Sequence, residues 1–453
     1  MQDIEKIIAS LEQPMLDTLC KWIQVPSVKG EPEDGAPFGR PAREALDLAL
    51  KTCEELGFKT QNVDGYAGHA DLGEGDTKDA LAILGHLDVV PVGDGWTKKP
   101  FSAEITDGKI FGRGTADDKG PVVAALYAMK AVQLSGVPLK RKVRLIVGTD
   151  EESGWADIEH YKTKVEMPRQ GFSPDADYPV INIEKGGLHV ELHGENDHGG
   201  LDVLSFNVGE RYNVIPGQAV AVVAGDQALA DQINGTDFGF PVDAKVEDGA
   251  VRIHTEGIPG HAAMPELGRN AIGQMLLVLK KLGVKGTLAA LADKVGLTCY
   301  GENLKIQAED TVSGKLTCSM GIIRVDKEKV FATLDIRCPI LVDPDAIAKM
   351  IARSLPEMKV VGLGGHDAHY VDADSELVQS LLQAYTEVTG QEGHAFAIGG
   401  GTYAKCLEEG VAFGALFPGE QEMAHQADEY ISIDSLKKNL RIFTYAILKL
   451  AAK

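Results

Sequence analysis

Apolar residues recur in two different patterns along the first 184 residues. Helical spacing predicts helices over residues 2–23, 42–56 and 121–134. Short apolar runs rich in β-branched residues predict strands over residues 79–90, 143–149 and 180–183. Strands that alternate with helices favour an α/β domain whose mostly parallel sheet carries helices on both faces.

The pattern changes after residue 184. Alternating apolar and polar positions predict antiparallel strands over residues 188–193, 219–224 and 330–336, and helical patterns interleave with them over 270–282 and 345–355. The first style returns later, with a helix over 376–389 and a last helix over 435–451 that Asp434 caps. We therefore expect a discontinuous domain of residues 1–184 and 373–453, interrupted by an α+β domain of residues 185–372.

Composition and charge narrow the function classes. The chain has 453 residues, of which 44% are hydrophobic, and a formal net charge of −22, which argues against nucleic acid and anionic membranes as partners. No secretory leader begins the chain and no apolar stretch approaches the ~20 residues of a membrane span, so we expect a cytoplasmic protein. The six cysteines lack a C-x-x-C pair and are expected to be reduced structural thiols.

Chemistry-bearing residues gather where apolar runs end. His86 and Asp88, Asp117 and Asp118, and the acidic run 150–152 follow three such runs, so we expect them at the carboxyl edge of the sheet, where ligands of α/β proteins bind. Imidazole and carboxylate ligands together suit zinc, manganese or cobalt, and one carboxylate can bridge two ions. The layout is typical of a two-metal hydrolase.

Six motifs in this order resemble those of the M20 family of metallopeptidases, and most closely those of its PepV-type dipeptidases. The resemblance extends almost from end to end of the chain. The motifs are Gly85-His86-Leu87-Asp88, the run 112–120 (GRGTADDKG), Asp150-Glu151-Glu152-Ser153-Gly154, the run 173–179 (SPDADYP), the run 257–262 (GIPGHA) and Met423-Ala424-His425. The resemblance implies a zinc-peptidase-like catalytic domain, and it makes the inserted domain a lid.

The resemblance also implies the metal ligands. His86 and Asp175 bind one ion, Glu152 and His425 bind the other, and Asp117 bridges both, with a cis peptide bond after it. Asp88 orients the ring of His86 through its second nitrogen.

Further residues are assigned to catalysis and to substrate binding. Glu151 precedes a metal ligand and is the expected general base for the water between the two ions. By resemblance, His261 of the inserted domain donates to the oxyanion. The residues expected to bind the substrate, one of them an arginine suited to a carboxylate, are Asn213, Arg337, Gly400, Gly401 and Thr402.

The substrate class rests on two features. Asp175 occupies a position that is Asp in dipeptidase and aminopeptidase branches and Glu in carboxypeptidase and deacylase branches, so we expect a metal-dependent dipeptidase acting on unblocked dipeptides. The long insert resembles the enlarged PepV lid, which favours a monomer over a homodimer. Two alternatives stay open: an M20-type N-acyl amino-acid deacylase, of the acetylornithine or succinyl-diaminopimelate type, and a metal-binding protein without turnover.

Overall fold

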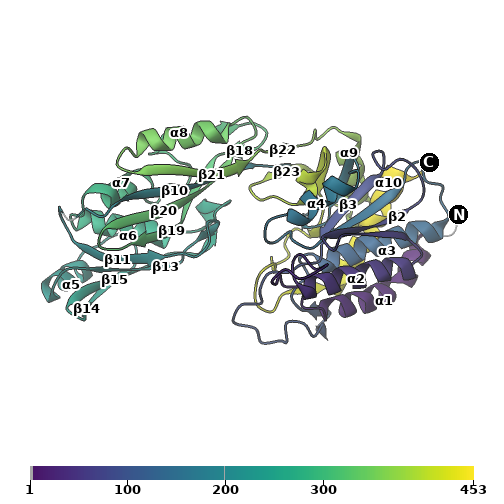
Figure 1. Cartoon of the computed structure of the whole chain (residues 1–453), viewed down its shortest axis with the longest axis horizontal. Coiled ribbons are helices and arrows are strands. Elements are labelled where there is room, and N and C mark those ends of the chain that lie inside the picture. The colour runs from purple at the N-terminus through teal and green to yellow at the C-terminus, as the bar shows by residue number, and fades with distance from the viewer. Residues whose placement is uncertain (1–3, 198) are drawn as a thin grey trace. The chain divides into compact units, whose positions relative to one another are not determined.

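The computed structural model describes residues 4–197 and 199–453 and divides the chain into two units (Figure 1). Unit 1 comprises the residues up to Asn182 together with 370–396 and 401–453, and unit 2 comprises 183–369 and 397–400. The expected boundaries lay at 184/185 and 372/373, and the structure adds the short segment 397–400 to unit 2. Within the described residues, no helix is both long and apolar enough to span a membrane.

The main sheet of unit 1 has parallel strands at its centre and antiparallel strands at its margins. Its strand order is β1-β2-β6-β3-β7-β24-β9-β22, and β23 pairs with β9. The neighbours β6, β3, β7 and β24 run parallel, whereas β1, β2 and β9 pair antiparallel. The strands of this sheet are β1 (Lys59–Val63), β2 (Ala67–Leu72), β3 (Leu81–His86), β6 (Val143–Gly148), β7 (Gln170–Ser173), β9 (Val180–Glu184), β22 (His369–Tyr370), β23 (Ala395–Ile398) and β24 (Glu409–Ala412). The fold class expected from the sequence is confirmed, and the sheet is mixed, with its parallel strands at the centre.

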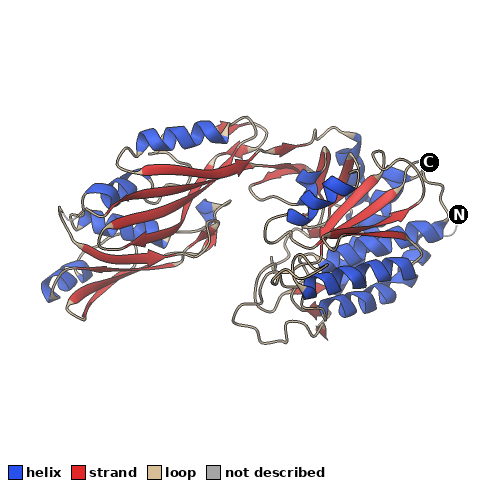
Figure 2. Cartoon of the chain, in the orientation of Figure 1, coloured by secondary structure: helices blue, strands red, loops and turns tan. Residues whose placement is uncertain are grey.

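Helices cover both faces of this sheet, as Figure 2 shows, and the pleat of β3 explains how. Leu81 and Ile83 point into a core shared with α1, α3 and α10, whereas Ala82 and Leu84 point into a second core under α4 and η2. All six residues of β3 are buried, which is why its sequence is continuously apolar. The helices of unit 1 are α1 (Ile4–Ile23), α2 (Arg40–Glu55), α3 (Lys119–Ser135), α4 (Ala156–Lys164), η2 (Tyr403–Cys406), α9 (Glu376–Thr389) and α10 (Ile433–Ala451).

Two small sheets of unit 1 lie close to the site described below. The first has the order β26-β5-β4, and the second pairs β25 with β8 in parallel. Their strands are β4 (Glu104–Thr106), β5 (Lys109–Phe111), β8 (Ala176–Asp177), β25 (Ala415–Leu416) and β26 (Tyr430–Ser432).

Unit 2 is an antiparallel sheet backed by helices, as its alternating sequence predicts. The strand order is β14-β15-β13-β11-β19-β20-β10-β21, and a separate core of apolar residues lies between the sheet and its helices. Two further pairs, β12 with β16 and β17 with β18, form separate two-stranded sheets. The strands of unit 2 are β10 (Gly186–Glu195), β11 (Val203–Val208), β12 (Val214–Ile215), β13 (Gln218–Val223), β14 (Val242–Glu247), β15 (Ala250–Glu256), β16 (Gly260–His261), β17 (Glu309–Asp310), β18 (Gly314–Lys315), β19 (Thr317–Val325), β20 (Lys329–Cys338) and β21 (Lys359–His366). Its helices are α5 (Gln227–Asn234), η1 (Pro265–Leu267), α6 (Ala271–Lys281), α7 (Gly286–Lys294) and α8 (Pro344–Ser354).

The predicted cap of the last helix is wrong. Helix α10 begins at Ile433, so Asp434 lies inside its first turn, and the cap is Ser432, whose Oγ accepts the N–H of Ser435 at 3.3 Å. A carboxylate in the first turn still favours the helix dipole, so the sequence signal was real but displaced by two residues. Residues 2 and 3 of the first predicted helix lie outside the described residues.

Candidate metal centre

The ends of three parallel strands bring the predicted ligands of unit 1 together. His86 is the last residue of β3, Asp175 comes two residues after β7, and Glu152 follows the end of β6. Since β6, β3 and β7 are parallel neighbours, their carboxyl ends share one edge of the sheet. Asp117 lies just before α3, and the peptide bond between it and Asp118 is cis, as the resemblance implies.

The carboxylate of Asp117 lies between two histidine rings. Its Oδ1 is 2.9 Å from Nε2 of His86, and its Oδ2 is 3.0 Å from Nε2 of His425. Nε2 of His86 is also 3.6 Å from Oδ2 of Asp175, and Nε2 of His425 is 3.0 Å from Oε1 of Glu152. The Nε2 atom of each histidine thus has one further carboxylate beside it, and Asp117 is the residue that the two groups share.

The hydrogen bonding of His86 fits a metal ligand. Its Nδ1 lies 3.0 Å from the backbone carbonyl of Asp88, and because a carbonyl only accepts, Nδ1 carries the proton of a neutral ring. With a metal ion bound, the neutral ring would offer the ion the lone pair of Nε2, which lies among carboxylate oxygens. The lone pair of Nε2 and the negative carboxylate oxygens repel one another, and a cation between them would remove this repulsion. Histidine together with carboxylate is a ligand set that divalent transition metals accept.

The excess of buried carboxylates in the site also favours the binding of positive charge. Burial lowers the pKa of His86, but the carboxylates of Asp117, Asp175 and Asp88 outweigh this and raise it well above its usual value. Contacts with Asp117 and Glu152 raise the pKa of His425 to about 10. Burial, followed by neighbouring carboxylates, raises the pKa of Glu152 and of Asp175. The cluster therefore favours cations, which is what a divalent ion supplies.

Glu151 lies within the same cluster. Ligand atoms of His86, Glu151 and Asp175 lie within 4.8 Å of one another, as do those of His86, Asp117 and Glu152. Burial and then the charges of Asp175, Glu152 and Asp117 raise the pKa of Glu151 well above its usual value, against a lowering effect of His86. Position alone does not separate a base from a ligand at this residue, so its role stays a proposal.

The carboxylate of Asp88 holds the backbone of the acidic run. Oδ1 accepts the N–H of Glu151 at 3.2 Å, and Oδ2 accepts the N–H of Glu152 at 3.1 Å. Oδ1 is 3.5 Å from Nδ1 of His86, which is longer than a normal hydrogen bond. The contact of Asp88 with the His86 ring thus runs through its carbonyl, while its carboxylate positions the two glutamates.

A second buried carboxylate supports the same segment and was missed in the sequence. Oδ2 of Asp157 accepts the N–H groups of Thr149 and Asp150 at 2.6 and 2.9 Å, and the hydroxyl of Tyr403 at 2.5 Å. Burial raises the pKa of Asp157 to about 6, although the hydrogen bonds lower it. Asp157 and Tyr403 are 246 residues apart in the chain, so no spacing pattern could have paired them.

The residues expected to contact the substrate from the inserted domain lie in unit 2. Val214, next to Asn213, pairs with His261 between β12 and β16, and the carbonyl of Asn213 accepts the N–H of Ala262 at 2.9 Å. Nδ1 of His261 accepts the N–H of Ala263 at 3.1 Å, so Nε2 carries the proton in the neutral ring and can act as a donor.

Arg337 is held by its own strand and by the glycine loop. Nε and Nη2 donate to the two carboxylate oxygens of Asp335 at 2.7 and 2.8 Å, and Nη1 donates to the carbonyl of Gly399 at 2.9 Å. A Cβ built on Gly399 would lie 2.7 Å from Cβ of Ala263, so glycine allows a close approach here. Unit 2 therefore brings Arg337, the start of the glycine loop and the segment of His261 together. Gly401 and Thr402 belong to unit 1, where the Thr402 hydroxyl accepts the N–H of Ala404 at 3.2 Å.

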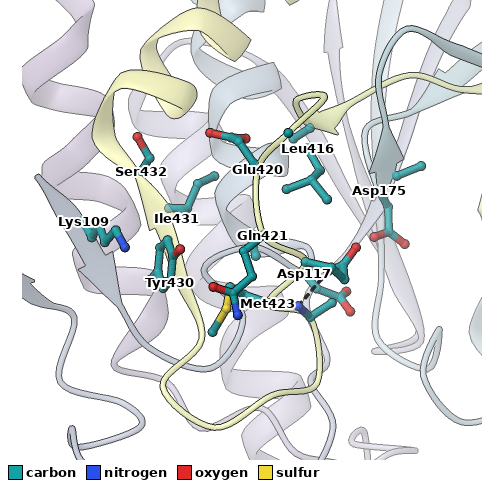
Figure 3. A pocket seen from close by; sticks show the side chains of 16 residues that line it. Lys109, Asp117, Asp175, Leu416, Glu420, Gln421, Met423, Tyr430, Ile431 and Ser432 are labelled. Carbon is teal, nitrogen blue, oxygen red and sulfur yellow. Dashed lines mark hydrogen bonds between the residues drawn. The ribbon is translucent and has the colours of Figure 1, made fainter. Parts of the chain in front are cut away.

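A cavity of about 400 Å³ opens beside the cluster in unit 1 (Figure 3). Asp117 and Asp175 lie at one side of it, and Lys109 and Ser432 lie at the other. Its apolar wall consists of Leu416, Met423 and Ile431. The volume is within the range of small-molecule sites and close to its lower end, which suits a ligand as small as one or two amino acids.

Comparisons with known proteins agree over nearly the whole chain. The family model described as Peptidase family M20/M25/M40 matches residues 82–449. "Putative dipeptidase YtjP" of Bacillus subtilis (strain 168) is 39% identical over 464 aligned residues, which cover 98% of this chain and 99% of that protein. The crystal structure of human carnosine dipeptidase 1 has a TM-score of 0.63 at 17% identity, and covers 99% of this chain and 98% of its own. The M20 family metallo-carboxypeptidase Sso-CP2 from Sulfolobus solfataricus has a TM-score of 0.58 at 22% identity, over 96% and 98% of the two chains. One fold thus serves a dipeptidase and a carboxypeptidase.

We expect Asp117→Ala to lose metal, because each oxygen of Asp117 faces a different histidine. The affinity for zinc should fall by at least about 100-fold, beyond the roughly 10- to 100-fold typical of losing an outer partner of a ligand. Metal analysis after dialysis against a zinc buffer measures this. Asp64→Ala, which removes a surface carboxylate paired with His160, is the control and should retain metal. Full metal content in Asp117→Ala would contradict the shared position of Asp117.

Proposed function

The chain belongs to the peptidase family M20/M25/M40, and from this premise we propose that it hydrolyses the peptide bond of unblocked dipeptides with two divalent metal ions. The observation that carries the proposal is the carboxylate of Asp117, which lies 2.9 and 3.0 Å from the rings of His86 and His425. A single-ion site would not need one carboxylate between two such groups. We propose zinc, with manganese or cobalt as alternatives, because nitrogen and oxygen ligands accept all three.

The substrate class is supported by the relatives and by the cavity. The relative with the name "Putative dipeptidase YtjP" aligns with 98% of this chain, and Asp175 occupies the ligand position discussed above. The cavity beside Asp117 and Asp175 offers space for a side chain of the substrate. The N-acyl amino-acid deacylase stays an alternative because the fold alone does not separate the two substrate classes.

The proposed chemistry assigns separate tasks to the residues of unit 1. Bound metals would lower the pKa of a water molecule and polarise the scissile carbonyl. Glu151 takes the proton of that water at its carboxylate and later gives it to the leaving amine. The place of Glu151 within the ligand cluster, close to His86 and Asp175, supports this exchange because its carboxylate is within reach of a water molecule held there.

The residues of unit 2 are proposed to recognise the substrate. The donor at Nε2 of His261 would stabilise the oxyanion. Arg337, with Asn213 and the loop of Gly400, Gly401 and Thr402, would bind the substrate carboxylate and backbone. The pairing with Asp335 fixes the guanidinium and leaves part of its five-donor fork for this purpose. The monomeric state and the cytoplasmic location stay predictions from the sequence.

A substrate panel tests the proposed function. We expect the zinc-loaded enzyme to hydrolyse unblocked dipeptides from a panel of Ala-containing and β-Ala-containing dipeptides, and to leave N-acetyl and N-succinyl amino acids intact. Mass spectrometry of the products distinguishes the classes, and treatment with a chelator should abolish hydrolysis. Activity restricted to the acylated compounds would establish the deacylase instead. Zinc binding without hydrolysis of either set would favour a non-catalytic protein.

Glu151→Gln should separate the base from the ligands. The amide keeps the shape of the side chain but takes no proton, so kcat should fall by about 100- to 10,000-fold while the metal content stays unchanged. Glu152→Gln is the matched variant and should lose metal, because Glu152 lies beside His425. Metal loss in Glu151→Gln would make Glu151 a ligand, and undiminished turnover would remove it from the mechanism.

His261→Ala tests the proposed oxyanion donor. A contact made mainly in the transition state lowers kcat and kcat/KM together, and the loss of one donor typically costs about 100- to 1000-fold. Steady-state kinetics with Ala-Ala measure both constants. His254→Ala, which removes a histidine of the same unit paired with Asp243, should retain activity. A raised KM with unchanged kcat would make His261 a binding residue only.

A further inference from the structure

Glu429 is a fully buried carboxylate that gathers the backbone of the loop before α3. It lies four residues after His425 and one residue before β26. Its Oε1 accepts the N–H groups of Gly114 and Ala116 at 3.0 and 2.9 Å, and the N–H of Asp117 at 3.3 Å. Three backbone donors therefore converge on one oxygen atom, and one of them belongs to the residue that faces both histidines.

Arg113 completes the arrangement from the other side. Its Nη1 is 2.6 Å from Oε2 of Glu429, and both side chains are almost completely excluded from solvent. Arg113 also donates to the carbonyls of Gln426 and Val92, both at 3.2 Å, and its guanidinium lies 5.2 Å from the ring centre of Trp96. The buried charge of Glu429 is thus paired and hydrogen-bonded, which is the condition under which a protein tolerates it.

These contacts join two loops that carry metal ligands. The N–H of Gly112 donates to the carbonyl of Glu429 at 2.8 Å, and Phe111 pairs with Tyr430 between β5 and β26. One loop leads to Asp117, and the other begins at His425, whose backbone lies in the left-handed region with a φ of 63°. A residue other than glycine adopts this conformation only where its surroundings fix it.

We propose that Glu429 is a positioning residue for the divalent metal site, which it organises by tying the loop of Asp117 to the loop of His425. The carboxylate oxygens of Glu429 accept backbone N–H groups and face Arg113, so they would not hold an ion. Glu429 sets the position of the Asp117 backbone, and Arg113 donates in addition to the carbonyl of Gln426, next to His425. The proposal rests on the ligand set proposed above. It assigns to Glu429 and Arg113 a function in metal affinity beyond the stability that a buried ion pair contributes.

Zinc binding to Glu429→Gln tests this proposal. The amide oxygen can still accept the three N–H groups, but its NH₂ group opposes the donors of Arg113, so the tie loosens without a cavity. We expect the affinity for zinc, measured by competition with a chromophoric chelator, to fall about 10- to 100-fold. The stabilisation that added zinc gives in thermal unfolding should fall in parallel.

Asp71→Asn is the matched control. Asp71 and Arg144 form a comparable, largely buried pair of unit 1, with two contacts of 2.7 Å between β2 and β6, and neither touches the ligand loops. Loss of the Asp71–Arg144 ion pair should lower the melting temperature and leave the zinc affinity unchanged. Wild-type zinc affinity in Glu429→Gln, with a lower melting temperature as in Asp71→Asn, would overturn the proposal and leave Glu429 a structural residue only.

Arg113→Lys provides a second measurement if Glu429→Gln does not fold. Lysine keeps one charge, but its single nitrogen cannot take the positions of both Nη1, which donates to Glu429 and Gln426, and Nη2, which donates to Val92. The zinc affinity of this variant should fall by at least about tenfold, and a wild-type value would overturn the proposal equally. Neither readout uses a peptide. Failure of the wild-type protein to bind zinc would refute the ligand set, whereas wild-type affinity in the variants would refute only the role of Glu429.

Discussion

The site of unit 1 depends on how the mutual repulsion between carboxylates at one edge of its sheet is balanced. Asp117, Glu152 and Asp175 lie 2.9 to 3.6 Å from histidine nitrogens, and burial strengthens the electrostatic interactions among these groups. Such a cluster is stable only where cations and fixed dipoles balance it. The hydrogen bonds of Asp88, Asp157 and Glu429 to the backbone serve this end, because they hold the loops in place around charges that would otherwise separate.

The sequence predicted the elements best where packing and local signals agree. The helix expected over 376–389 is α9 with the same bounds, since Ser375 caps it and Gly390 ends it in the left-handed region. The buried strands were recognised from continuous apolar runs. The strands at the margins of the sheet were not recognised, because short edge strands such as β1 are mostly exposed and have little alternation of apolar and polar residues. The prediction of Asp434 as the cap of the last helix was wrong because Ser432, two residues earlier, is also able to cap and does so in the structure.

His86, Asp117 and Glu152 were visible in the sequence because they follow apolar runs, whereas Asp175 and His425 were proposed as ligands only through the resemblance to the M20 family. The supporting residues were not visible. Asp157 meets Tyr403, and Arg113 meets Glu429, across more than 240 residues, and only the folded chain brings them together. Arg113 belongs to the motif of residues 112–120, but the sequence predicted no role for it. Arg337 does pair with Asp335, the ordinary fate of an arginine in a strand, and this pairing is compatible with a further task.

The insertion of unit 2 into unit 1 has a consequence for biosynthesis. The ribosome releases β3, β6 and β7 early, then the whole of residues 183–369, and only afterwards β24, His425 and α10. The inserted unit has its own core and can fold while the surrounding unit still lacks a central strand. Four of the five proposed metal ligands are therefore synthesised before unit 2, and the fifth, His425, follows only when translation is nearly complete, so the proposed site is assembled at the end of synthesis.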